Sequence, residues 1–386
     1  MQFRTRAIHV GNQPDPQTGA VVRPIHMAAT FAQPGAGEWG EFDYSRSGNP
    51  TRKAFETTLA DLEGGIGALA FASGMAATHC AMMLVSSGEA VLAGGDIYGG
   101  TYRLLHQVLD RSGVRVSLVS TGDLKAVEAA ITPKTKILWI ESPGNPLLSI
   151  TDIAACAEIA HRHGVLLGVD NTFATPVLTR PLELGADIVM HSATKYIGGH
   201  SDLLGGALVT KDKALLDQLY FLQNATGAVM GPLESFLCSR GLKTLELRVR
   251  EQSRTAGQIA DYLAADPRIA KVRYPGRVDH PGHAIAKRQM DGAFGAMLSC
   301  EIRGDFAAAK RLAESTELFQ LAVSLGAVES LVEQPASMSH ASYRREDRLA
   351  HGINDSLIRI SVGLEAFEDL RSDLDQALSK AVSPAA

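Results

Sequence analysis

The chain has 386 residues, of which 45% are hydrophobic and 20% are charged, and its formal net charge is −5. This length and apolar content are enough for two or three domains with a large buried core. The mild negative charge argues against nucleic acid or an anionic membrane surface as a partner. No stretch reaches the ~20 apolar residues that a membrane-spanning helix requires, so we expect a soluble protein.

The four cysteines are far apart in the sequence and form no paired motif. Disulfide scaffolds and zinc sites both require closer, paired spacing. We therefore expect reduced cysteines and no metal site. The first residues contain no apolar run that resembles a signal peptide, which favours a cytoplasmic protein.

Residues 1–50 are predicted to be irregular, because five prolines and recurrent glycines interrupt any long helix. A structureless stretch of this length in a globular protein usually has a function. It could cover a site or wrap around a partner subunit.

Residues 51–250 alternate helical patterns with short apolar runs of strand length. Seven such runs occur, at 68–73, 90–96, 115–120, 135–142, 164–171, 187–193 and 205–210. Continuous apolar runs are typical of strands that are covered on both faces. This part of the chain is therefore predicted to be an α/β domain with a largely parallel sheet.

A long helical pattern from about residue 241 to Pro267 leads into a smaller C-terminal domain, residues 251–386. That domain offers strand-like runs at 296–303, 318–325 and 357–364 and a last helix at 366–380.

Reactive side chains gather where the predicted strands end, which is where open α/β sheets bind ligands. They are Ser73 with Gly74, Tyr98, Asn145, Asp170, Ser192, Thr194 and Lys195. Each alone has an ordinary explanation, such as a helix cap, a turn or a surface charge. Their shared placement favours a site.

Pyridoxal phosphate (PLP) is one cofactor that this set fits. It needs a lysine, an acid beside its ring nitrogen, an anion-binding turn and a stacking aromatic ring. Lys195, Asp170, the turn at residues 73–75 and Tyr98 have the right chemistry, although spacing alone does not identify the cofactor.

Six longer motifs identify the family. They are YSRSGNPT at 44–51, FASGMAA at 71–77, DIYGGTYR at 96–103, ESPGNPLL at 141–148, VDNTFATPVLTRPLELGADIVMHSATKYIGGHSD at 169–202 and LIRISVGLE at 357–365. Together they resemble the Cys/Met-metabolism PLP-dependent enzymes along essentially the whole chain. The resemblance implies an aspartate-aminotransferase-like fold (PLP fold type I) with a seven-stranded, mostly parallel central sheet plus a smaller C-terminal α/β domain.

The resemblance also implies roles for individual residues. Lys195 would hold the cofactor as a Schiff base, Asp170 would pair with the pyridine nitrogen, and Tyr98 would stack on the ring and assist catalysis. The phosphate would be bound by Gly74, Met75, Ser192 and Thr194.

The substrate would be bound by Asn145, Ser324 and Arg359, with Arg359 on its α-carboxylate. The enzyme would be a homotetramer of catalytic dimers, in which Tyr44 and Arg46 reach the phosphate of the neighbouring subunit.

Two positions bear on the choice of activity within the family. Gly100 stands where similar methionine γ-lyases usually carry cysteine, and Val323 stands where many members carry glutamate. The stretch around Val323 is similar to that of bacterial γ-lyases. We therefore expect a PLP-dependent carbon–sulfur lyase that converts cystathionine to cysteine, 2-oxobutanoate and ammonia, and that also releases sulfide from homocysteine.

Two alternatives in the family stay open, namely cystathionine γ-synthase, acting on an activated homoserine ester, and methionine γ-lyase. A protein that binds the cofactor without turnover is disfavoured, because Lys195, Asp170 and Arg359 are all present.

Overall fold

The larger sheet has seven strands, as predicted, in the computed structural model, which describes residues 1–341 and 344–382. Strand β7 is antiparallel to both of its neighbours, and the other pairs are parallel. In order across the sheet, the strands are β1 (Gly67–Phe71), β7 (Gly206–Thr210), β6 (Ile188–Ser192), β5 (Leu166–Asp170), β4 (Thr135–Glu141), β2 (Ala90–Gly94) and β3 (Arg115–Val119).

Both faces of this sheet are buried in apolar clusters. Successive strand residues point to opposite sides of the sheet, so neighbouring residues belong to different clusters. In β1, Ala68 and Ala70 belong to one apolar cluster, and Leu69 and Phe71 belong to the other. The first cluster includes residues of α1 (Phe3–His9), α2 (Pro50–Glu63), α5 (Leu124–Ala130), α6 (Ile153–Arg162), α7 (Thr175–Leu178), α9 (Pro232–Leu242) and α10 (Leu245–Ala265). The second includes α3 (Gly74–Met82), α8 (Lys213–Thr226) and the π-helical turn Leu104–Leu109 that continues α4 (Gly99–Arg103).

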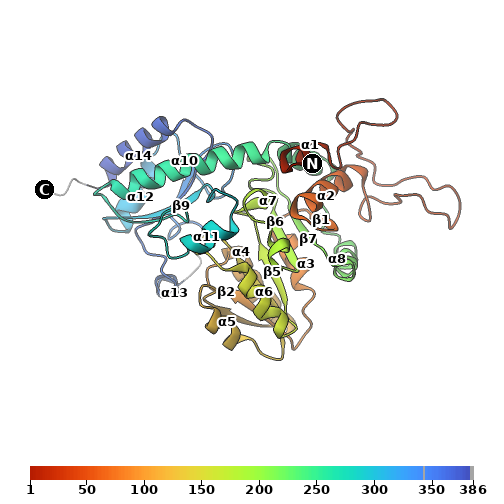
Figure 1. Ribbon diagram of the computed structural model, residues 1–386, viewed down its shortest axis with the longest axis horizontal. Helices are drawn as coiled ribbons and strands as arrows, with labels where there is room; N and C mark the ends of the chain where they lie inside the picture. The colour runs from red at the N-terminus through yellow and green to blue at the C-terminus, as the bar shows by residue number, and fades with distance from the viewer. Residues whose placement is uncertain (342–343, 383–386) are drawn as a thin grey trace.

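The smaller sheet has five strands, and the long helix α10 leads to it (Figure 1). In order, they are β10 (Gln320–Leu321), β11 (Leu331–Glu333), β12 (Leu357–Ser361), β9 (Met297–Ile302) and β8 (Ile269–Arg273). The helices of this part are α11 (His283–Gln289), α12 (Phe306–Ser315), α13 (Arg345–Ala350) and α14 (Phe367–Ala381). The predicted division into domains stays a prediction, and its boundary at residue 250 falls inside α10.

The segment between α1 and α2 forms long loops that extend away from the sheets and helices (Figure 1). A few bonds tie its end to α2. Asn49 accepts hydrogen bonds from the backbone of the first turn of α2, while its amide nitrogen donates to His26 O at 2.8 Å. In the part of the chain that is described, no helix combines the length and apolarity that crossing a bilayer would require.

Candidate active site

A cavity of about 550 Å³ lies at the carboxyl ends of β2, β4, β5 and β6, and residues of the smaller sheet also line it. It brings together eleven of the thirteen predicted site residues. They are Gly74, Met75, Tyr98, Asn145, Asp170, Ser192, Thr194, Lys195, Val323, Ser324 and Arg359. A volume of this size is within the range of cofactor and ligand sites.

Lys195 lies in the turn after β6, and its Nζ donates to Ser324 Oγ at 2.6 Å. Burial, together with the nearby charge of Arg359 and against the opposing charge of Glu333, lowers the pKa of this amine to about 8. A larger share of the amine is therefore neutral near pH 7 than for an ordinary lysine, which suits a nucleophile or a base. Ser324 has φ 95°, a conformation that non-glycine residues rarely adopt outside functional sites.

Two carboxyl groups lie side by side at the strand ends, because Asp170 of β5 pairs in register with Glu141 of β4. Burial raises the pKa of both, and for Glu141 the charge of Asp170 adds to the rise. Asp170 Oδ1 accepts from Thr172 N at 3.0 Å, which favours its ionised form, and Glu141 Oε2 accepts from Tyr98 N at 2.8 Å. A protonated ring nitrogen beside Asp170 would offset the cost of its buried charge.

A buried polar network lies behind Asp170, on the opposite face of the sheet. His191 Nε2 lies 2.5 Å from Glu63 Oε1, which also accepts from Asn171 Nδ2 at 3.0 Å. These contacts join β6 and the end of β5 to α2. The charge of His191 lowers the pKa of Asp170 and so opposes the effect of burial.

The turn into α3 has the features of an anion site. Ser73 caps this helix by accepting from Ala76 N at 3.1 Å, and the unpaired first N–H groups of a helix attract phosphate. A Cβ on Gly74 would lie 2.9 Å from Ser192 Cβ, so only glycine allows this close approach. Ser192 and Thr194 line the same cavity. An amine, a buried acid and an anion site within one cavity fit pyridoxal phosphate.

Arg359 lines the same cavity as Lys195 and is held by three partners. Its Nη1 lies 3.0 Å from both Asn145 Oδ1 and Glu333 Oε1, and its Nη2 donates to Ser324 O at 2.8 Å. Glu333 on β11 pairs in register with Arg359 on β12, so the ion pair bridges adjacent strands. The guanidinium is 5% exposed, and its planar fork suits a carboxylate.

Three charged cavity residues were not predicted, namely Arg103, Glu141 and Glu333. Glu141 ends an apolar run in the same way as Asp170, so the same argument from strand ends could have identified it. Arg103 is the last residue of the short helix α4 and does not end a strand, and Glu333 ends a strand of only three residues. Periodicity marks neither of them.

Tyr44 and Arg46 do not line the cavity of their own chain. Arg46 Nη1 donates to Asn224 O at 2.7 Å and to Asn224 Oδ1 at 2.9 Å, and its guanidinium lies 5.6 Å from the centre of the Tyr44 ring. Their predicted role in a neighbouring subunit stays a prediction.

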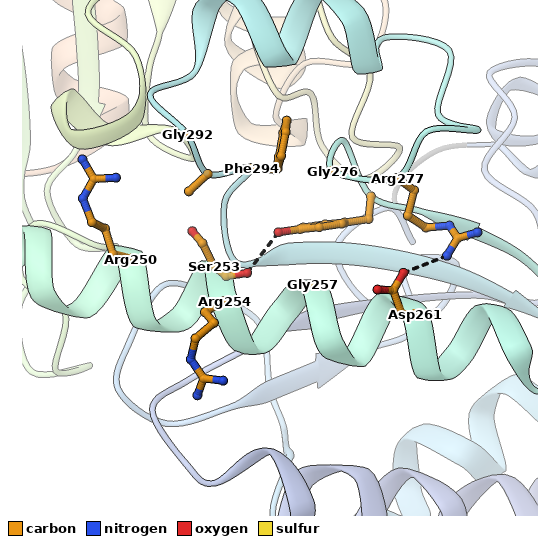
Figure 2. Close-up of a pocket in the computed structure, with 11 residues that line it drawn as sticks. Arg250, Ser253, Arg254, Gly257, Asp261, Gly276, Arg277, Gly292 and Phe294 are labelled. Atoms are coloured by element: carbon orange, nitrogen blue, oxygen red, sulfur yellow. Dashed lines mark hydrogen bonds and ion pairs between the residues drawn. The ribbon is translucent and has the colours of Figure 1, made fainter.

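A second cavity, of about 410 Å³, lies along α10 and shares no lining residue with the first (Figure 2). Its three arginines, Arg250, Arg254 and Arg277, are each ion-paired with carboxylates. The pair between Arg277 and Asp261 is drawn in Figure 2. Because these charges are already matched, the cavity does not concentrate positive charge for an anionic ligand.

Comparisons with known proteins agree with this geometry. Residues 4–379 match the family described as Cys/Met metabolism PLP-dependent enzyme. The chain is 51% identical to a cystathionine β-lyase from Coxiella burnetii, over 97% of both chains. It is 52% identical to a cystathionine γ-synthase from Mycobacterium tuberculosis, over 97% of this chain and 96% of the other. A solved cystathionine γ-lyase from Lactobacillus plantarum, complexed with L-serine, is 48% identical with a TM-score of 0.96, covering 99% of each chain.

Proposed function

Since this chain belongs to the Cys/Met metabolism enzymes, which depend on pyridoxal phosphate, we propose that it catalyses γ-elimination on sulfur amino acids, chiefly cystathionine. Cystathionine and water give cysteine, 2-oxobutanoate and ammonia, and homocysteine releases sulfide by the same route. The observation that carries the proposal is one cavity that is lined by Lys195, by Arg359 and by the apolar residue Val323.

The cofactor would be held by Lys195 through its amine, by Asp170 at the pyridine nitrogen and by Tyr98 against the ring. Its phosphate would lie at the start of α3, on the N–H groups of Gly74 and Met75 and the hydroxyls of Ser192 and Thr194. When bound, it supplies an electron sink for the bond broken at Cα.

The chain's own groups would bind the substrate and move its protons. Arg359 binds the α-carboxylate, and Asn145 and Ser324 fix the guanidinium in position. Lys195, once free, takes the proton from Cα, because its lowered pKa leaves it partly neutral. Tyr98, 44% exposed at the cavity, gives a proton to the departing sulfur.

A substrate panel tests the proposed activity. We expect cystathionine to yield mainly 2-oxobutanoate and cysteine, and homocysteine to yield sulfide at a lower kcat/KM. Pyruvate with homocysteine as the main products would mean β-elimination, the activity in the name of the Coxiella burnetii relative. Faster formation of cystathionine from cysteine and a homoserine ester would mean γ-replacement. Either result would overturn the proposal.

Val323 gives a prediction about specificity. Valine cannot accept a hydrogen bond from the distal ammonium of cystathionine, whereas glutamate can, in a charge-assisted bond worth roughly 1.5–3 kcal/mol. Val323 is 61% exposed, so solvent screening reduces this gain. We expect Val323→Glu to raise the preference for cystathionine over homocysteine by up to about tenfold in kcat/KM. Val323→Gln is the uncharged control, and equal ratios in all three proteins would contradict the idea.

The shared cofactor site gives a prediction about assembly. If Arg46 completes the phosphate site of a partner subunit, Arg46→Ala and Lys195→Ala are each inactive, but a hybrid dimer contains one intact site. We expect hybrids purified through two different affinity tags to recover up to half of the activity per subunit of the unmodified enzyme. No recovery in proven hybrids would contradict a shared site.

A further inference from the structure

We infer that Arg52 is a positioning residue that acts across the subunit boundary, by fixing the backbone of Arg46. This inference rests on the proposed shared site. Arg52 lies in the first turn of α2, is 4% exposed and does not line the cavity. It therefore affects the cofactor only through the loop that it holds.

The guanidinium of Arg52 binds the two peptide groups that flank the Cα of Arg46. Its Nη1 donates to Ser45 O at 2.7 Å, and its Nη2 donates to Arg46 O at 3.1 Å. The first carbonyl belongs to the peptide unit before Arg46, and the second belongs to the unit after it. Because φ and ψ are the only soft backbone torsions, holding both units fixes the direction in which the Arg46 side chain leaves the chain.

Besides Arg52, the turn is held by its own backbone bonds and by α8, where Tyr220 donates to Ser47 O at 3.2 Å and Asn224 accepts from Arg46. Ser47 N and Gly48 N both donate to Tyr44 O at 2.9 Å, and Ser45 N donates to Ala29 O at 2.8 Å. These bonds close the turn on itself and on the same extended loop. Arg52 and its neighbour Asn49, whose amide donates to Ser45 Oγ at 3.1 Å, connect the turn to α2.

A buried guanidinium needs bonding partners to replace the water that it loses, and the partners of Arg52 are mainly backbone carbonyl groups. Its Nε lies 3.6 Å from Glu56 Oε1, beyond ideal hydrogen-bond length. That same oxygen accepts from Ala70 N at 2.8 Å, at the edge strand β1. Arg52 thus links the loop to the body of the sheet, and lysine in its place would keep a cation near Glu56 but lose the fork across the two carbonyls.

The test measures the PLP concentration that half-restores activity to the apoenzyme. Arg52→Lys alone is expected to raise it by about tenfold, since displacing a positioned group by about 1 Å can cost up to a hundredfold. In a hybrid with Lys195→Ala, only the site with an intact Lys195 is active, and its loop comes from the partner, in which Arg52 is intact. The half-saturating concentration should therefore return to that of the unmodified enzyme.

Arg248→Lys is the matched control. Arg248 is also 4% exposed and donates to backbone carbonyls, Tyr196 O at 2.7 Å and Gly241 O at 2.8 Å. It thereby holds the turn that follows Lys195 in its own subunit. Its effect on PLP binding should persist in the hybrid with Lys195→Ala, whereas the effect of Arg52→Lys should vanish.

The outcomes separate the two proposals. If Arg46→Ala hybrids recover activity but Arg52→Lys hybrids keep the raised half-saturating concentration, Arg52 supports only its own subunit and the inference is wrong. An unchanged half-saturating concentration in Arg52→Lys alone also overturns it. If Arg46→Ala hybrids fail as well, the shared site itself is wrong. If Arg52→Lys does not assemble alone, the half-saturating PLP concentration can still be measured in the tagged hybrid. Arg52→Gln is then tested as a second variant.

Discussion

Lys195→Ala should reduce turnover by at least about a thousandfold, because both a nucleophile and a proton carrier are lost, and a positioned acid–base group alone contributes about 10²–10⁴-fold. The purified protein should also lose the yellow colour of lysine-bound cofactor. Both losses follow from an amine that is held by Ser324 and has a lowered pKa. Steady-state kinetics and the visible absorption spectrum measure them.

Lys211→Ala is the control for this substitution. Lys211 follows β7 of the same sheet, and its Nζ donates to Leu182 O at 2.9 Å, outside the cavity. It should keep both colour and activity. An unchanged visible spectrum in Lys195→Ala would mean that another group holds the cofactor.

Arg359→Lys should lower kcat/KM by about 10- to 100-fold, chiefly through KM, since each lost charge-assisted bond to a carboxylate is worth roughly 1.5–3 kcal/mol. Lysine keeps a cation beside Glu333 but cannot present two parallel N–H groups. Initial rates at varied cystathionine separate KM from kcat. A KM that stays the same would show that the α-carboxylate lies elsewhere.

Arg359→Ala should have a second effect, on stability. Glu333 is 1% exposed and would remain as a buried carboxylate without its cation, at a cost of roughly 3–5 kcal/mol. A fall in Tm that is largely reversed by adding Glu333→Gln would identify this cause. A Tm that Glu333→Gln does not change would contradict it.

The larger sheet was predictable because its strands are covered on both faces. Runs such as Val91–Ala93 and Ile137–Ile140 are continuously apolar, and each predicted run overlaps one of the seven strands. In the smaller sheet, β8 and β11 escaped prediction. The first has two exposed residues among its five, and the second is only three residues long, so neither has a periodic signal.

The site was predictable where chemistry coincides with strand ends. Asp170 and Lys195 lie there, and the structure brings them into one cavity. The pairing of Arg359 with Glu333 depends on the register of β11 against β12, which no local pattern encodes. Tyr44 and Arg46 lie outside the cavity of their own chain, so their predicted role requires a second subunit, which no pattern in one chain encodes.

The placement of Val323 bears on how activities diverge among related enzymes. Asp170 and Arg359 are each buried on a strand, where a substitution disturbs packing as well as chemistry, whereas Val323 is an exposed residue in the connection between β10 and β11. Exposed substitutions usually change stability by no more than about 0.5 kcal/mol. If Val323 selects the substrate as we propose, its replacement would change selectivity with little effect on folding. Proteins named as β-lyases and γ-synthases both reach about half identity with this chain, so overall identity at this level does not separate their reactions, and the difference between them must lie in few positions.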